Sequence, residues 1–238
     1  MGSGLLPCMG MHAQDRKLDK EVVMFWLHAD LETHLDRLED FKRICSNTFK
    51  HLSQHGMHLY GAWETVVGPR NLIVDLWRFD SEEVMLRAFG SMQGLAAWQQ
   101  FAKEVPPTIL EENVRGITPL PYCPEFRTLK TRAILYWRMR TKREAFQEWV
   151  EARSKFIPMA EKQGLVLAAA WTSALTGGPQ GECAEAWFFS DQNRIGEAVA
   201  RLEQDEKVKK ILAQGRTLLV RDSTALMRPA WYSPDYLP

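Results

Sequence analysis

The stretch from His55 to Ala88 reads HGMHLYGAWETVVGPRNLIVDLWRFDSEEVMLRA, and much of it occurs again later in the chain. Gly56 and Trp63 recur 108 residues further on, and Trp77 recurs after 110 residues. A period of this length is typical of a duplicated domain, because solenoid repeats are roughly 20–50 residues long. We therefore look for function in what two similar halves build together.

Hydrophobic periodicity predicts the same order of elements in both halves, β-α-β-β-α-β, which is the ferredoxin-like arrangement. In the quoted stretch, two strands flank a turn at Gly68-Pro69, and Ser81 is a natural N-cap for the helix that follows. Gly56 is the expected stop of the helix before it. The predicted strands cover 21–28, 57–67, 71–79, 113–120, 131–140, 165–175, 183–189 and 224–229, and the predicted helices cover 31–55, 81–105, 142–163 and 195–212.

These elements divide the chain into a disordered N-terminal extension (1–20), a first ferredoxin-like domain (21–124) and a second, diverged one (125–238). Each predicted sheet carries helices on one face only, so its other face must be covered. The two units can cover each other sheet to sheet. We therefore expect an α+β fold in which both units form one intrachain α/β barrel.

The quoted segment resembles the NIPSNAP family of the dimeric α/β-barrel superfamily. The residues that carry the resemblance are Gly56, Gly61, Trp63, Gly68, Asn71, Trp77 and Arg87. The second half keeps Gly164 and Trp171 but lacks counterparts of Gly61 and Asn71. The resemblance implies a barrel, and related barrels include cofactor-free monooxygenases, polyketide cyclases, isomerases and haem-degrading enzymes. Such likeness concerns the fold more than the chemistry.

Composition narrows the range of partners. Thirty basic and thirty acidic residues cancel, so nucleic acid is not an expected partner. No apolar run suggests a membrane span and no secretory leader is evident, which makes the cytoplasm the expected location. The four cysteines are scattered singly and indicate neither a zinc site nor disulfides. A monomer and a homodimer are both compatible with the duplication.

A carboxylate lies within the second hairpin strand of each half, Asp75 in the first and Glu185 in the second. Burial would raise the pKa of such a group towards values useful for acid–base catalysis. Strand alternation places Trp77 on the same side as Asp75, an arrangement that suits a planar substrate. The alternative is that both carboxylates face water or pair with an arginine from a neighbouring strand.

The first strand of each half carries His28 and Tyr136 at equivalent positions. We expect His28 near Asp75 as a base or proton shuttle, or else at the surface where its strand ends. In the second half, Arg132, Tyr136, Arg138 and Arg140 share one face of a strand, and Arg138 could clamp a carboxylate or phenolate. Alternation also predicts that Tyr60 and Trp63 face opposite ways.

The candidate residues are therefore Asp75 and His28 for catalysis, and Trp63, Trp77, Tyr60, Tyr136, Arg138 and Glu185 for substrate binding. No cofactor is expected, and no metal. Haem is the alternative, because His51 and His55 have the i, i+4 spacing of a ligand pair at a helix end. The helix dipole alone also favours histidine there.

Two classes of function follow from this pattern. One is a metal- and nucleotide-independent enzyme, such as a cyclase, isomerase, lyase or oxygenase, that acts on a hydrophobic, aromatic or polyketide-like small molecule. Its pocket would lie between sheet and helices of the first half. The other is a binding or adaptor protein whose barrel is purely structural.

Overall fold

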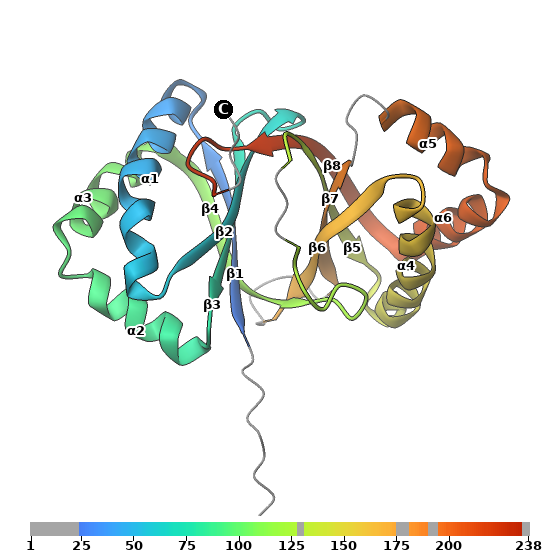
Figure 1. Ribbon diagram of the computed structural model, residues 1–238, viewed down its shortest axis with the longest axis horizontal. Coiled ribbons are helices and arrows are strands. Elements are labelled where there is room, and N and C mark those ends of the chain that lie inside the picture. The colour runs from blue at the N-terminus through green and yellow to red at the C-terminus, as the bar shows by residue number, and fades with distance from the viewer. Residues whose placement is uncertain (1–23, 128–130, 175–180, 190–194, 235–238) are drawn as a thin grey trace, which may run out of the picture.

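In the part of the chain that the structure describes, eight antiparallel strands form a closed barrel and six α-helices lie outside it (Figure 1). The computed structural model describes residues 24–127, 131–174, 181–189 and 195–234, so the predicted extension 1–20 lies outside the described part. The strands are β1 (Phe25–Thr33), β2 (His58–Val67), β3 (Leu72–Phe79), β4 (Ile109–Pro119), β5 (Ile134–Thr141), β6 (Leu165–Ser173), β7 (Glu182–Phe189) and β8 (Leu219–Pro229). The helices are α1 (Leu38–Leu52), α2 (Glu82–Met92), α3 (Ala96–Glu104), α4 (Phe146–Glu161), α5 (Ile195–Gln204) and α6 (Glu206–Leu218).

The strand order around the barrel is β1-β3-β2-β8-β5-β7-β6-β4. Each half contributes a continuous run of four strands, β4-β1-β3-β2 from the first and β8-β5-β7-β6 from the second. Hydrogen bonds between β2 and β8 and between β4 and β6 join the two runs at their edges. The closed ring gives each of these eight strands two neighbours.

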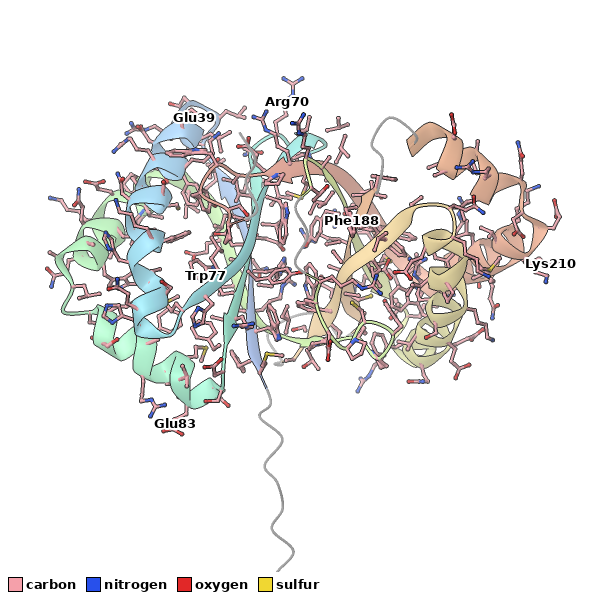
Figure 2. The ribbon with its side chains drawn as sticks, in the orientation of Figure 1. Glu39, Arg70, Trp77, Glu83, Phe188 and Lys210 are labelled. Atoms are coloured by element: carbon pink, nitrogen blue, oxygen red, sulfur yellow. The ribbon has the colours of Figure 1, made fainter. Side chains whose placement is uncertain are left out.

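The barrel separates two kinds of core. Helices α1 to α3 cover one side of the ring and α4 to α6 cover the opposite side (Figure 1). The lumen is filled mainly by aromatic and small side chains from both halves, including Trp26, Trp63, Tyr136 and Trp171. Figure 2 shows Trp77 between the strands and α1, in a separate core under the helices of the first half. A buried residue on a strand thus faces either the lumen or the helices.

The predicted end of the first strand is wrong. We expected a helix from residue 31, but β1 continues to Thr33 and α1 begins only at Leu38, after a short 3-10 turn. The strand continues because Asp30 and Leu31 pair with β3 on one side and β4 on the other. Two predicted signals are confirmed: Gly56 ends the helical segment with a φ of 83°, and the Ser81 hydroxyl accepts from the Val84 amide.

The last strand of each half begins earlier than predicted, β4 at Ile109 and β8 at Leu219. Both early segments are rich in charged residues, which hid them from a pattern based on apolar runs. They nevertheless pair with β1 and β5. As a result Arg221 lies on β8 and reaches one mouth of the barrel. No helix in the described ranges is long and apolar enough to cross a membrane.

Candidate functional site

His28 lies inside the barrel because β1 alternates between the two cores. Trp26 packs in the lumen cluster, whereas Ala29 and Leu31 pack under the helices. His28 and Asp30 contact Tyr136, which reaches the lumen from β5. The His28 side chain is 1% exposed. The strand therefore presents an imidazole and a carboxylate, two positions apart, to a largely apolar interior.

Both ring nitrogens of His28 have partners. The Arg115 Nε donates to His28 Nδ1 at 3.2 Å. Because a guanidinium can only donate, Nδ1 is the acceptor and the ring hydrogen lies on Nε2. His28 Nε2 is 3.1 Å from the Tyr136 hydroxyl and 3.3 Å from Asp30 Oδ1. This neutral tautomer has a carboxylate in place to stabilise an added proton.

Asp30 balances the positive charges around His28. Burial alone would raise its pKa, but the His28 ring, followed by Arg138 and Arg115, holds the pKa of Asp30 well below its usual range. Arg115 Nη2 donates to Asp30 at 2.6 Å, and Arg138 Nη2 lies 3.5 Å from the same oxygen. Burial, and then the charge of Asp30, raises the pKa of the Tyr136 hydroxyl well above its usual value. Next to His28, Asp30 is thus the anion, and Tyr136 is a neutral hydrogen-bond donor.

A cavity of about 140 Å³ opens above these residues at the end of the barrel. We call it the mouth cavity. An apolar cavity of about 150 Å³ in another protein binds benzene, so this volume admits one six-membered ring. Trp171 and Tyr136 stack with ring centroids 6.0 Å apart and give the cavity a flat aromatic wall. Its lining comes from both halves: His28, Arg115, Ile117, Tyr136, Arg138, Met139, Arg140, Trp171, Ser173, Glu182, Cys183, Ala184, Arg221 and Ser223.

Arginines dominate the polar part of the lining. Arg115 is held by Asp30 and by Glu182, whose Oε2 lies 2.5 Å from Arg115 Nη1. Arg138 also faces Asp30, and its side chain is 39% exposed. Two further cations, Arg140 and Arg221, bring the number of arginines at the mouth to four. The cavity therefore suits a small planar anion, and it is more polar than expected for a hydrophobic, aromatic or polyketide-like molecule.

Asp75 lies on the other side of the sheet. It pairs with Ala29 across β1 and β3, while His28 pairs with Leu76, so the two predicted catalytic residues point in opposite directions. The expected contact between them is not formed, and Asp75 does not line the mouth cavity. The Tyr232 hydroxyl donates to Asp75 Oδ1 at 3.0 Å. Burial raises the pKa of Asp75 to about 7.

Glu185 occupies the equivalent position in the second half and is completely buried. Arg153 on α4 donates to both of its oxygens, and the hydroxyl of Tyr122 and the indole N–H of Trp187 complete the set. Glu185 thus pairs with an arginine, but this arginine comes from helix α4 and not from a neighbouring strand as expected. Because these four hydrogen bonds occupy its carboxylate, Glu185 has a structural role beneath α4.

The prediction that Tyr60 and Trp63 face opposite ways is wrong. A register shift between Leu59 and Gly61 interrupts the alternation of β2. Both rings consequently face the lumen, with centroids 6.3 Å apart, and line a small void of about 10 Å³. Trp77 instead packs on Phe49 under α1. Neither Tyr60, Trp63 nor Trp77 belongs to the mouth cavity.

Sequence reasoning missed Asp30, Arg115, Trp171 and Glu182 as site residues. Asp30 could have been found, because it lies two positions after His28, but the strand was ended too early. Arg115 and Glu182 lie on β4 and β7, and only the pairing of distant strands reveals that they meet. Arg132, expected on the face of Tyr136, precedes β5 and is exposed.

The histidines proposed for haem do not form a fitting site. His51 is exposed at the end of α1, and His55 lies beyond the helix, 3.4 Å from the Ser91 hydroxyl. Neither imidazole lines the mouth cavity. Within the described ranges no group of three or more His, Cys, Asp or Glu side chains could hold a metal ion. Nor has the mouth cavity room for a porphyrin, since its volume suits a single ring.

Comparison with known proteins supports the resemblance in the first half. Residues 23–124 match the sequence model of the NIPSNAP family, so this part of the chain is a NIPSNAP domain. No curated protein matches the sequence. Solved structures extend the likeness to both halves and show the barrel fold.

Three solved structures illustrate this likeness in fold. An anthrone oxidase-like protein aligns with a TM-score of 0.64 and 8% identity, covering 88% of this chain and 92% of that one. A candidate monooxygenase from Lactobacillus acidophilus aligns with a TM-score of 0.60 and 9% identity, covering 87% and 94%. A candidate chlorite dismutase aligns with a TM-score of 0.53 and 12% identity, covering 87% and 96%.

Proposed function

We propose that this NIPSNAP-domain barrel is an enzyme that removes a proton from a small planar keto acid and holds the resulting anion in the mouth cavity. One observation carries the proposal: His28, held by Arg115, Asp30 and Tyr136, lies at the floor of a cavity surrounded by arginines. A base next to preorganised positive charge is what formation of an enolate requires.

In the proposed mechanism, the substrate carboxylate binds Arg138, which is the more exposed of the two arginines that contact Asp30. The ring of the substrate lies against Trp171. Arg115 turns from His28 Nδ1 towards the developing oxyanion, which frees the lone pair of Nδ1 for the substrate proton. Asp30 then stabilises the imidazolium through Nε2. Binding of the anion and activation of the base are thereby coupled.

The chemistry of this first step fits each class of enzyme predicted from the sequence. Loss of a proton next to a carbonyl gives an enolate, from which isomerisation, cyclisation, elimination and reaction with oxygen can all start. The names of the structural neighbours, a candidate monooxygenase and an anthrone oxidase-like protein, support such chemistry. The proposal assigns the proton to His28 and gives Asp75 and Glu185 no contact with substrate.

The proposal also includes the domain organisation expected from the sequence, with tandem ferredoxin-like units over 21–124 and 125–238. The two four-strand runs support this division. The mouth cavity takes residues from both units, so the second is part of the site. A single chain then holds a complete site, as a monomer or within a dimer.

The test is hydrogen–deuterium exchange at the benzylic carbon of phenylpyruvate, followed by NMR in D₂O. The wild-type protein should accelerate exchange, and His28→Gln should lose about 100-fold or more of that rate. Tyr136→Phe keeps the shape of the lumen and should change the pH profile of the rate, because it removes a hydroxyl bonded to His28. Lys210→Gln, on the outer surface of α6 (Figure 2), is the control.

Two results would overturn the proposal. One is a wild-type rate no higher than that of His28→Gln. The other is equal loss in His28→Gln and Lys210→Gln, which would show that the exchange does not depend on the lumen.

A further inference from the structure

An open hollow of about 470 Å³ adjoins the mouth cavity on the outside of the barrel. We call it the outer hollow. Arg140, Thr141, Lys142, Arg143, Glu144 and Val220 line it. Arg140 also lines the mouth cavity, so the two spaces share a wall. Arg221 of the mouth cavity directly follows Val220 of the outer hollow in the chain. A ligand in the mouth cavity can therefore extend into the outer hollow along Arg140.

The cations at this junction are distinguished by lying together around two spaces that share Arg140. Among the described residues, no ion pair or side-chain hydrogen bond engages them. These are Arg140, Lys142, Arg143 and Arg221. The chain has a formal net charge of zero, so four unpaired cations around one opening are a local concentration of positive charge.

The charge of the outer hollow exceeds what a carboxylate would need. Three cations, Arg140, Lys142 and Arg143, and one acidic residue, Glu144, line the outer hollow, and Arg221 lines the adjoining mouth cavity. A carboxylate carries one negative charge, whereas a phosphate monoester carries about 1.5–2 at neutral pH. A diphosphate carries more. Arginine and lysine are also the side chains that bind phosphate most readily. The balance of charge thus favours a phosphorylated group over a second carboxylate.

We propose that the ligand of this barrel has two parts, a planar acid head in the mouth cavity and a phosphate or diphosphate tail in the outer hollow. The assignment rests on the proposed function for the head and adds the chemical class of the tail. Arg140 contacts both parts because it lines both spaces. Lys142 and Arg143 contact the tail alone. The site therefore selects phosphorylated planar acids over the free acids.

The test measures the binding of two probes by calorimetry at about 0.15 M ionic strength, where long-range attraction is screened beyond about 8 Å. Inorganic pyrophosphate probes the outer hollow and benzoate probes the mouth cavity. The double variant Lys142→Gln/Arg143→Gln should weaken pyrophosphate binding about tenfold or more and leave benzoate binding unchanged. The matched control is Lys207→Gln/Lys210→Gln, two exposed cations on α6, which should change neither probe by more than about twofold.

The outcomes separate the two proposals. Absence of pyrophosphate binding to the wild-type protein, or equal weakening in both double variants, would overturn the phosphate tail while benzoate binding still supports the acid head. Loss of pyrophosphate binding confined to Lys142→Gln/Arg143→Gln, with no benzoate binding by any variant, would support the phosphate site and overturn the planar acid head.

Discussion

Arg153 donates to both oxygens of Glu185, from Nε at 2.9 Å and from Nη2 at 2.5 Å, and both side chains are buried. The position equivalent to Arg153 in the first half is Cys45, 108 residues earlier. The first half therefore buries Asp75 beside a thiol, whereas the second buries Glu185 against a cation. This difference leads to the first two predictions.

Arg153→Met should destabilise the protein by about 3–5 kcal/mol, because it leaves the Glu185 charge buried without its cation. The guanidinium also lies 4.4 Å from the Phe156 ring and 4.7 Å from the Trp137 ring, contacts that the variant weakens. Urea denaturation measures the change. Arg216→Met on α6 is the exposed control, and adding Glu185→Met should recover most of the loss. A cost below about 1 kcal/mol would show that the pair contributes little.

Asp75→Asn should change the pH dependence of stability. The folded-state pKa of Asp75 is raised from 3.8 to about 7, so the folded protein keeps a proton that the unfolded chain releases. Stability from this group is therefore fully present below pH 3.8 and is lost as the pH rises to about 7. Asparagine does not titrate. The free energy of unfolding of Asp75→Asn, relative to that of the wild type, should therefore rise by up to about 4 kcal/mol over this interval.

Urea denaturation of both proteins at several pH values between 4 and 8 tests this prediction. The informative quantity is the difference in free energy of unfolding between Asp75→Asn and the wild type, since other titrating groups cancel in it. A difference that stays constant with pH would show that Asp75 is ionised throughout.

Arg138→Gln should weaken benzoate binding about tenfold or more, because a hydrogen bond to a charged group contributes about 1.5–3 kcal/mol. Quenching of tryptophan fluorescence can report the binding, since Trp171 lines the mouth cavity. Arg216→Gln removes an exposed arginine elsewhere and should leave the affinity unchanged. Equal affinities of Arg138→Gln and the wild type for benzoate would show that Arg138 does not bind the carboxylate.

Gly61→Ala should destabilise the barrel by about 1–3 kcal/mol. A Cβ at Gly61 would lie 2.5 Å from Cη2 of Trp63, so the indole would have to move within the lumen. Gly90→Ala is the matched control, because no atom beyond its chain neighbours and the backbone of its own helix lies within 4 Å of its Cβ, and alanine favours the helix. It should be neutral or slightly stabilising in thermal denaturation. Equal melting temperatures for Gly61→Ala and wild type would contradict the crowding.

Much of the fold was predictable because its signals are local. Gly56, Ser81 and the 3.6-residue periodicity of the helices place most elements near their observed positions. The position of the last strands was harder, since charged residues such as Arg221 lie within β8. Pairing with β5, which no local pattern reveals, keeps that segment extended.

The candidate site was less predictable for two physical reasons. Strands buried on both faces carry apolar residues throughout, so alternation shows which residues share a face without showing whether it is the lumen face. This ambiguity led us to pair His28 with Asp75. The bulge near Gly61 then shifts Tyr60 to the face of Trp63. An isolated glycine within a strand is a signal of such a bulge, and the alternation argument did not use it. Arg115 could only be placed once the β1–β4 register was known.

A tyrosine after the last strand of each half contacts a buried carboxyl group, and this has a consequence for folding during translation. Tyr122 follows β4, the last strand of the first half, yet contacts Glu185, and Tyr232 follows β8, the last strand of the second half, yet contacts Asp75. Ser233 and Ala230 also bond to Ala62 on β2. On the ribosome, the first half emerges long before residues 230–233. Until those residues emerge, Asp75 lacks its partner Tyr232, and strand β2 lacks its neighbour β8. The carboxyl group of Asp75 and the edge of β2 therefore gain these partners only once the last part of the barrel has been translated.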